Sequence, residues 1–314
     1  MNFLKIGAID IGSNGIRLFI ANVLEDSEQT TVYKESIHRI PLRLGEDVFT
    51  SGLVSELKKI NLIKVMQAFK LLMEVEQLKI YRVCATSALR EASNADAIVA
   101  DVKRFAGLNI DIISCEEESS LLFQSRKLSF LKPKHDYLYI DLGGGSLDIT
   151  FFNLNQNIES ASFKLGTIRI LKGLTSQDEF ERLKKWLLNI INKSNKIQLI
   201  GSGGNINKIF KKANVEKDNP LSLRKIQKIR KELLSHNFNE RMKFMELNSD
   251  RADVILPATE LFISIMQWTN IDEITVPIVG LCDGIVANEY LKYIAENKKS
   301  NVKPLEINSN QSEY

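Results

Sequence analysis

Cysteine and histidine are both scarce in this sequence, with three of each in 314 residues. The cysteines form no CxxC pair and lie far apart, at Cys84, Cys115 and Cys282. This pattern predicts free thiols in a reducing compartment. No histidine pair has a metal-ligand spacing such as HxxxH, which argues against a His-based zinc site and a Ser-His-Asp triad. Hydrolytic chemistry would have to use carboxylates and a hard cation bound through oxygen.

Long apolar runs are missing as well. No stretch of 18 apolar residues occurs, so the sequence predicts no membrane-spanning helix. Lys5 and Asp10 interrupt the first apolar run, which argues against a signal peptide. Together with the free thiols, these absences predict a cytoplasmic protein. The net charge of +3 and the pI of about 8.6 are too weakly basic to indicate nucleic acid by themselves. We therefore expect no membrane and no specific nucleic acid as a partner.

The composition is that of an ordinary globular protein, but the chain is long for a single core. Apolar residues make up 44% and charged residues 26% of the 314 residues, and two domains are the default at this length. Strand-helix alternation with hairpins mixed in predicts α/β domains with a mixed sheet. The best linker candidate is the segment 130–137 (FLKPKHDY). We expect domains at 1–126 and 127–314, a C-terminal helix able to pack back on the first domain, and a frayed tail after Asn297.

One motif occurs twice and carries most of the functional signal. The stretches 8–20 (AIDIGSNGIRLFI) and 138–152 (LYIDLGGGSLDITFF) each place an aspartate, Asp10 or Asp141, at the end of an apolar strand before a glycine turn. Glycine lets backbone N–H groups converge on an anion, and the aspartates can hold a hard cation beside it. Plain hairpin chemistry is the alternative, and the repetition favours phosphate binding. The candidate phosphate-binding residues are Gly12, Ser13, Asn14, Gly143, Gly144, Gly145 and Ser146.

A third glycine turn opens a predicted helix in the stretch 200–210 (IGSGGNINKIF), so Gly203 and Gly204 are further phosphate candidates. The residues alone do not decide the roles of two other segments. The stretch 114–123 (SCEEESSLLF) holds either acids that compensate a helix dipole or a general base, and the arginine of 85–94 (ATSALREASN) contacts either phosphate or solvent. The run 205–231, with nine Lys/Arg against two Asp/Glu, is either a solvated helix face or a track for a polyanion.

Taken together and in this order, these five stretches resemble the exopolyphosphatase and guanosine pentaphosphate phosphohydrolase family, in its short two-domain form. The resemblance spans about residues 1–290. It implies two RNase H-like domains of the actin, Hsp70 and sugar-kinase group around a central cleft. It also implies roles: Glu118 activates water, Arg90 faces phosphate, Asp141 is associated with the metal, and the glycine turns bind phosphate.

The sequence departs from the family pattern in its two turns. Gly15 replaces a serine or threonine in the first turn. Leu147 and Asp148 replace the Thr-Glu pair that usually ends the second turn, and Asp148 is shorter than glutamate. On this resemblance we expect Mg²⁺, or another divalent cation, to be held by Asp141, Asp148 and Asp10. The departures bear on turnover rate and chain-length preference more than on the fold.

The resulting functional hypothesis is an exopolyphosphatase, which releases terminal orthophosphate from inorganic polyphosphate. The same catalytic residues would serve a pppGpp phosphohydrolase, because both substrates end in a phosphoanhydride. A kinase of the same fold would need an adenosine pocket and an acceptor site, for which the sequence has no clear signature. A non-catalytic sensor of polyphosphate or nucleotide is the alternative from another class. The resemblance also implies a homodimer.

Overall fold

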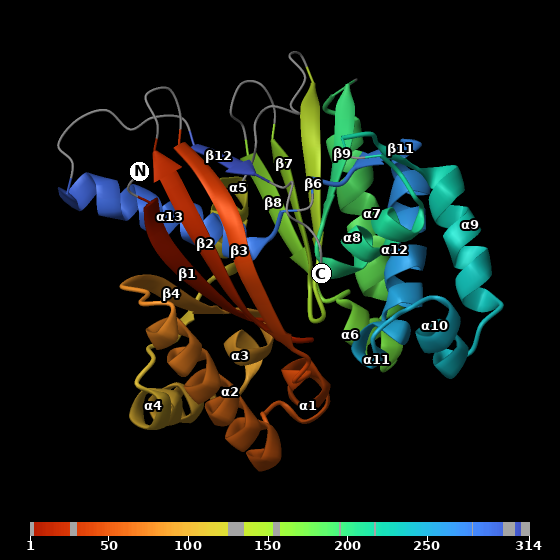
Figure 1. Ribbon diagram of the computed structural model, residues 1–314. Helices are drawn as coiled ribbons and strands as arrows, with labels where there is room; N and C mark the ends of the chain where they lie inside the picture. Colours follow the sequence, from red (N-terminus) through yellow and green to blue (C-terminus); the bar gives the residue numbers. More distant parts are fainter. Residues whose placement is uncertain are drawn as a thin grey trace. The chain divides into compact units, whose positions relative to one another are not determined.

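The computed structural model describes residues 3–25, 30–124, 135–152, 158–194, 196–216, 218–277, 279–297 and 305–308 (Figure 1). The chain divides into two compact units. The first unit comprises Met1–Leu128 and Val279–Tyr314, and the second comprises Ser129–Ile278. The domain boundary expected at 126/127 lies outside the described residues. No helix in the described ranges is long and apolar enough to cross a bilayer.

The first unit is built on a mixed sheet of six strands in the order β12-β3-β2-β1-β4-β5. The strands β1, β2 and β3 form an antiparallel meander, while β4 pairs in parallel with β1, and β5 in parallel with β4. β12 adds a parallel edge strand beside β3, so part of the tail expected to fray is paired. The bounds are β1 Phe3–Ile11, β2 Ile16–Glu25, β3 Thr30–Ile40, β4 Ile80–Ala85, β5 Asp111–Ile112 and β12 Leu305–Asn308.

The second unit repeats this plan with the order β8-β7-β6-β9-β11-β10. Again an antiparallel meander of three strands is followed by two strands parallel to its first member. The order shared by the two meanders and the strands that follow them confirms the two RNase H-like folds that the family resemblance implies. That a cleft separates them stays a prediction. The bounds are β6 Asp136–Leu142, β7 Leu147–Phe152, β8 Ile158–Phe163, β9 Ile197–Ser202, β10 Leu221–Ser222 and β11 Glu273–Thr275.

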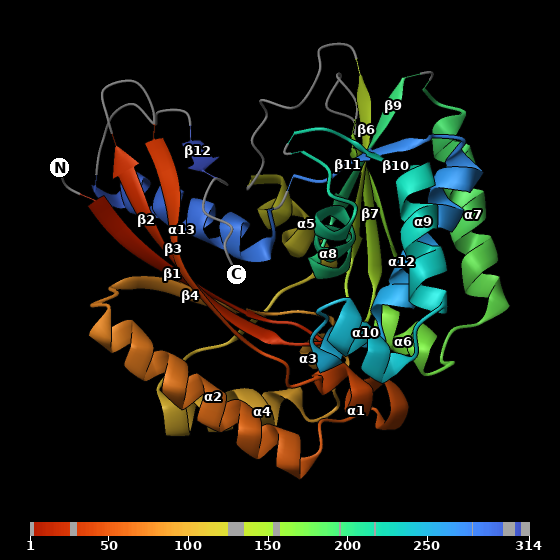
Figure 2. The ribbon, with the colours of Figure 1, turned by 45° about the vertical axis from the view of Figure 1, so that its right-hand side comes forward.

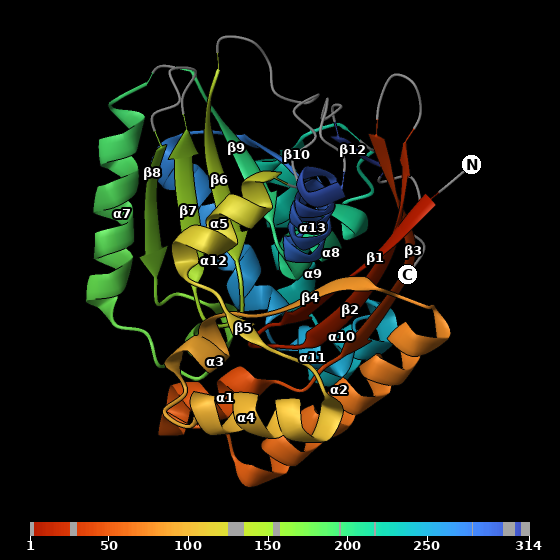
Figure 3. The ribbon, with the colours of Figure 1, turned by 90° about the vertical axis from the view of Figure 1, so that its left-hand side faces the viewer.

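Helices cover both faces of the first sheet (Figures 2 and 3). On one face, α2 and α4 pack against alternating strand residues such as Ile9, Ile11 and Leu18. α4 ends at Ala106, and the next residue, Gly107, adopts φ 68°, a left-handed conformation that glycine allows. On the other face, α13 packs on β1 and β4 and beside α5. The bounds are α1 Leu44–Ser51, α2 Glu56–Val75, α3 Ser87–Glu91, α4 Ala95–Ala106, α5 Cys115–Gln124 and α13 Leu281–Asn297.

In the second unit the most apolar helix, α12, forms the centre of the core. Its residues Ala258, Phe262 and Ile265 are completely buried and repeat at helical spacing, with α7, α8 and α9 packed against it. The bounds are α6 Thr167–Leu171, α7 Gln177–Ile191, α8 Gly204–Lys212, α9 Leu223–Leu234, α10 Phe238–Phe244, α11 Ser249–Ala252 and α12 Ile255–Thr269.

Candidate functional site

In the first unit, the predicted site residues meet where the parallel strands end. Ile11 of β1 lies in register with Ala85 of β4, and Ala85 with Ile112 of β5. The N–H of Thr86 donates to the Ile11 carbonyl at 3.2 Å, and the N–H of Ile113 donates to the Ala85 carbonyl at 3.0 Å. Ligand sites in α/β folds form at this carboxyl edge. The segments that follow β1, β4 and β5 carry the first glycine turn, Arg90 and Glu118.

Asp10 lies at this edge with its side chain only 6% exposed, and it forms an ion pair with Arg17, Nη1 to Oδ2, at 2.7 Å. The two residues are directly opposite in the β1–β2 hairpin, so they share one face of the sheet. Burial raises the pKa of Asp10, and the charges of Arg17 and Arg39 offset only part of that rise. Part of the charge of Asp10 is thus balanced within the protein, and its role as a metal ligand stays a prediction.

Backbone N–H groups from a later segment of the chain bind the carbonyl groups of the first turn, Gly12–Gly15. The N–H of Gly45 donates to the Ser13 carbonyl at 2.9 Å, and the N–H of Arg43 donates to the Asn14 carbonyl at 3.2 Å. A planar trans peptide carries its C=O and N–H on opposite sides, and the described chain has no cis peptide. The N–H groups of Asn14 and Gly15 therefore point away from the segment that holds the turn, as an anion site requires.

Glu118, on the first turns of α5, contacts the predicted phosphate-facing arginine. Its Oε2 lies 3.2 Å from Nη1 of Arg90, at the end of α3, and the two side chains are 13% and 22% exposed respectively. The same Nη1 donates to the Ile113 carbonyl at 2.8 Å. Arg90 thus links the loop after β5 to α5, and it fixes the direction of a half-buried carboxylate at the edge of the sheet.

The three neighbouring glutamates of α5 have separate roles, which the sequence left undecided. Glu117 accepts a hydrogen bond from Arg82 Nη2 at 2.7 Å, so it is engaged in an ion pair with β4. Hydrogen bonds from its own backbone and from Ser114 lower the pKa of Glu116, as expected for an acid that caps a helix. Glu116 therefore fits the helix-dipole reading of the stretch, while Glu118 faces Arg90 and its role as a general base stays a prediction.

The second turn, Gly143–Ser146, repeats this arrangement in the other unit. The N–H of Thr167 donates to the Gly143 carbonyl at 3.1 Å, and that of Ile168 to the Gly144 carbonyl at 2.9 Å. Arg169, buried at the start of α6, donates from Nε to the Gly145 carbonyl at 2.8 Å. With three successive carbonyls held on one side, the N–H groups of Gly144, Gly145 and Ser146 point to the other. This is a backbone concavity suited to an anion.

The third glycine turn lies against the second, as the parallel pairing of β6 with β9 dictates. Asp141 is in register with Ser202, the last residue of β9. Gly203 adopts φ 101°, and a Cβ there would come within 2.8 Å of the Leu142 carbonyl and 3.3 Å of Asp141 Oδ1. Gly204 then begins α8. The predicted phosphate residues of the second unit are thus adjacent, with a helix N-terminus among them.

The predicted metal residues of this unit, Asp141 and Asp148, are directly opposite each other in the β6–β7 hairpin. Two carboxylates on the same face of a hairpin repel each other, and a cation between them removes that cost. Ser146 Oγ also donates to Asp148 Oδ2 at 2.6 Å. This donor set fits Mg²⁺, which prefers one or two carboxylates with phosphate oxygens and water completing its shell. In the described ranges no three His, Cys, Asp or Glu side chains group together as a metal cage.

The sequence did not single out several residues that contact the predicted site residues or pack against the turns. A four-residue turn makes Asp10 and Asp141 pair with the residue seven positions later, so Arg17 could have been found from the hairpin register. Gly166 gave no such signal: a Cβ there would overlap the Gly144 and Gly145 backbone, which only the tertiary structure reveals. Arg251 likewise reaches α8 from a distant helix, where Nη1 lies 3.4 Å from Asn205 Oδ1.

The chain resembles known proteins in both sequence and fold. The model of the Ppx/GppA phosphatase family matches residues 29–293. A bifunctional 3-dehydroquinate synthase/phosphatase of Fusobacterium nucleatum is 32% identical over 175 residues, which are 54% of this chain and 26% of that protein. Exopolyphosphatase 1 of Mycobacterium tuberculosis is 26% identical over 190 residues, which are 59% of this chain and 54% of that protein. The chain therefore spans about half, or less, of the length of these relatives.

Solved structures resemble the chain along almost its whole length. The Aquifex aeolicus member of the Ppx/GppA family has a TM-score of 0.72 at 25% identity, covering 93% of this chain and 99% of its own. An exopolyphosphatase from Cytophaga hutchinsonii has a TM-score of 0.75 at 21% identity, covering 93% and 97%. The second likeness concerns the fold alone. With a family model matched from strand β3 to helix α13, the chain belongs to the Ppx/GppA phosphatase family.

Proposed function

We propose that this chain is an exopolyphosphatase that hydrolyses the terminal phosphoanhydride of inorganic polyphosphate. The observation that carries the proposal is the Glu118–Arg90 pair at the sheet edge where the Gly12–Gly15 turn begins. A carboxylate directed by an arginine beside an anion-binding turn is suited to activate water against a phosphate group. The exopolyphosphatase names of several relatives support the substrate class.

In the proposed reaction, Glu118 orients a water molecule and accepts its proton as the oxygen attacks the terminal phosphorus. The bond from that phosphorus to the bridging oxygen breaks, and the bridging oxygen leaves with the shortened chain. Arg90 and the N–H groups of the turns stabilise the charge on the phosphate oxygens. Most of the rate enhancement then comes from positioning and electrostatics, as in other phosphoryl transfers.

Mg²⁺ would be held by Asp141 and Asp148, whose opposed carboxylates are described above, with Asp10 as the further predicted ligand. When bound, the cation would neutralise phosphate oxygens and make the phosphorus a better electrophile. Asp148 accepts a hydrogen bond from Ser146 Oγ, so its carboxylate is already oriented at the turn. A cytoplasmic location and a homodimer are further parts of the proposal that rest on the sequence and on the family.

The experiment is a substrate panel for the purified chain, with and without Mg²⁺: long-chain polyphosphate, pppGpp and ATP. We expect orthophosphate release from polyphosphate that depends on Mg²⁺ and is faster than release from the two nucleotides. Faster release from pppGpp would favour the other activity of the family name. Tight binding of polyphosphate with no release would instead favour a sensor and would overturn the proposal.

A further inference from the structure

Arg43 adopts a backbone conformation that is unusual for an arginine. It precedes α1 with φ 53° and ψ 46°, in the left-handed region. A residue with a Cβ avoids this region unless its surroundings impose it, and such strain is concentrated near functional sites. The position matters because the N–H of Arg43 holds the Asn14 carbonyl of the first turn.

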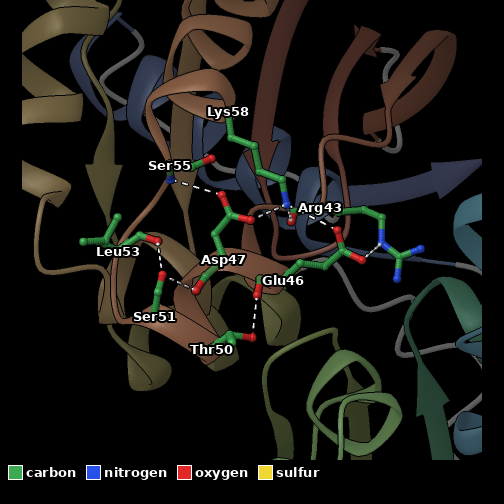
Figure 4. A network of polar contacts seen from close by, with 8 residues as sticks. All are labelled: Arg43, Glu46, Asp47, Thr50, Ser51, Leu53, Ser55 and Lys58. Atoms are coloured by element: carbon green, nitrogen blue, oxygen red, sulfur yellow. Dashed lines mark hydrogen bonds and ion pairs between the residues drawn. The ribbon is translucent and has the colours of Figure 1, made fainter.

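Lys58, in the first turn of α2, contacts Arg43 at its carbonyl group, which also accepts the N–H of Glu46 at 3.1 Å (Figure 4). Its Nζ donates to the Arg43 carbonyl at 2.6 Å and lies 2.9 Å from Asp47 Oδ1 and 3.3 Å from Glu46 Oε2. An ammonium group has three N–H donors, and each has one acceptor here. The planar guanidinium of an arginine could not satisfy the same three directions.

The two acids are themselves fixed. Asp47 Oδ2 accepts the Ser55 N–H at 3.1 Å, and Glu46 Oε1 lies 3.0 Å from Arg43 Nε. Burial would raise the pKa of Asp47, but hydrogen bonds from Ser55 and Lys58 outweigh it and lower the pKa. The carboxylate therefore stays ionised at neutral pH, and the network is a rigid link between α1 and α2.

The chain of contacts ends at the turn. Lys58 fixes Arg43, and Arg43 and Gly45 together hold the carbonyls of Asn14 and Ser13. Those carbonyls set the direction of the Gly15 and Asn14 N–H groups, because each shares a peptide plane with one of them. A change at Lys58 would thus turn the donors of the anion site without touching any ligand.

We propose that Lys58 is a positioning residue for the first phosphate-binding turn, an inference that rests on the proposed function. Its loss frees Arg43 to leave the left-handed region, so the turn samples orientations in which its N–H groups miss the phosphate. The consequence is weaker binding of the phosphate chain, with the overall fold preserved.

Lys58→Met tests this, with Lys59→Met as a matched control. Lys59 is the next residue of α2, is similarly exposed, and also contacts two carboxylates, Glu56 at 3.0 Å and Asp101 at 3.2 Å. We expect Lys58→Met to raise the KM for polyphosphate about tenfold, the effect of losing one charge-assisted hydrogen bond. Lys59→Met should leave KM unchanged, and the two melting temperatures should be similar.

A second measurement separates this inference from the proposed function. The dissociation constant of inorganic tripolyphosphate is measured by calorimetry with Mg²⁺ in the Glu118→Gln background, which suppresses turnover. If the wild-type chain releases no phosphate, the proposed function fails alone, and a Lys58→Met effect of about tenfold on tripolyphosphate binding still supports the positioning role. Equal KM values and equal dissociation constants for the two lysine variants would overturn it.

Discussion

In the absence of metal, neutralising one member of the Asp141–Asp148 pair should raise the melting temperature of the protein. The same change should remove the rise in melting temperature that Mg²⁺ gives. The two side chains are directly opposite on one face of the β6–β7 hairpin, where Cβ atoms are about 5 Å apart. Asp148→Asn keeps the size of the side chain and an oxygen that can still accept the hydrogen bond from Ser146 Oγ. The substitution therefore removes one charge and keeps the shape of the side chain.

The size of the effect follows from Coulomb repulsion. Two unit charges about 5 Å apart repel by about 1 kcal/mol in a water-like medium and by about 3 kcal/mol at an effective dielectric constant of roughly 20. Both residues are partly exposed, so the lower value applies. At about 2–4 °C per kcal/mol for a domain of this size, Asp148→Asn should melt a few degrees higher than the wild type in chelator.

Mg²⁺ should reverse the order of the two proteins. At ten times its dissociation constant, a ligand that binds only the folded state adds about 1.4 kcal/mol to the free energy of unfolding. Wild type should therefore gain several degrees on addition of Mg²⁺, and Asp148→Asn little. Asp178→Asn, at the start of α7 in the same unit, is the control and should respond like the wild type. An Asp148→Asn variant that melts lower in chelator, or gains as much from Mg²⁺, would refute the metal assignment.

Two further substitutions test the turns. Asp10→Asn should raise the melting temperature at pH 7, because burial raises the pKa of Asp10 and disfavours its ionised form in the folded chain. The gain should vanish below about pH 4, where the folded and unfolded chains both carry the protonated acid. A variant less stable than wild type at pH 7 would contradict this. Gly166→Ala should lower the free energy of unfolding by about 1–3 kcal/mol and slow phosphate release at least tenfold, because its Cβ would overlap the Gly144 and Gly145 backbone. Gly280→Ala is the control: its Cβ meets nothing within 4 Å, and it should change neither quantity.

Much of the fold could be predicted from local sequence signals. The two Asp-Gly hairpins, the helix now seen at Glu56–Val75 and the one ending at Gly107 all follow from periodicity and turn chemistry. The repeated hairpin also indicates that the two units share a topology, because the same Asp-x-Gly pattern after a buried strand favours the same local meander. What local signals could not predict is the pairing of residues 305–308 with β3, which joins strands far apart in the sequence.

The candidate site was predictable in its residues and less so in their partners. An acidic helix start and an arginine after a strand marked the two segments, and the family resemblance singled out Glu118 and Arg90 within them. The structure brings these two side chains within 3.2 Å. For Asp10 the sequence indicated a cation bound to phosphate, which stays a prediction, and it gave no sign of the ion pair with Arg17 that the structure shows. The contacts that hold the turns come from backbone N–H groups of distant segments, which leave no trace in composition or spacing.

The most direct test of the central claim is the initial rate of orthophosphate release from polyphosphate by Glu118→Gln compared with Glu116→Gln. The two glutamates belong to the same helix turn, and Glu118 forms the ion pair with Arg90. The account predicts a rate about 10² or more below wild type for Glu118→Gln, as for the loss of a general base, and a near-normal rate for Glu116→Gln. Equal rates for the two variants would contradict it.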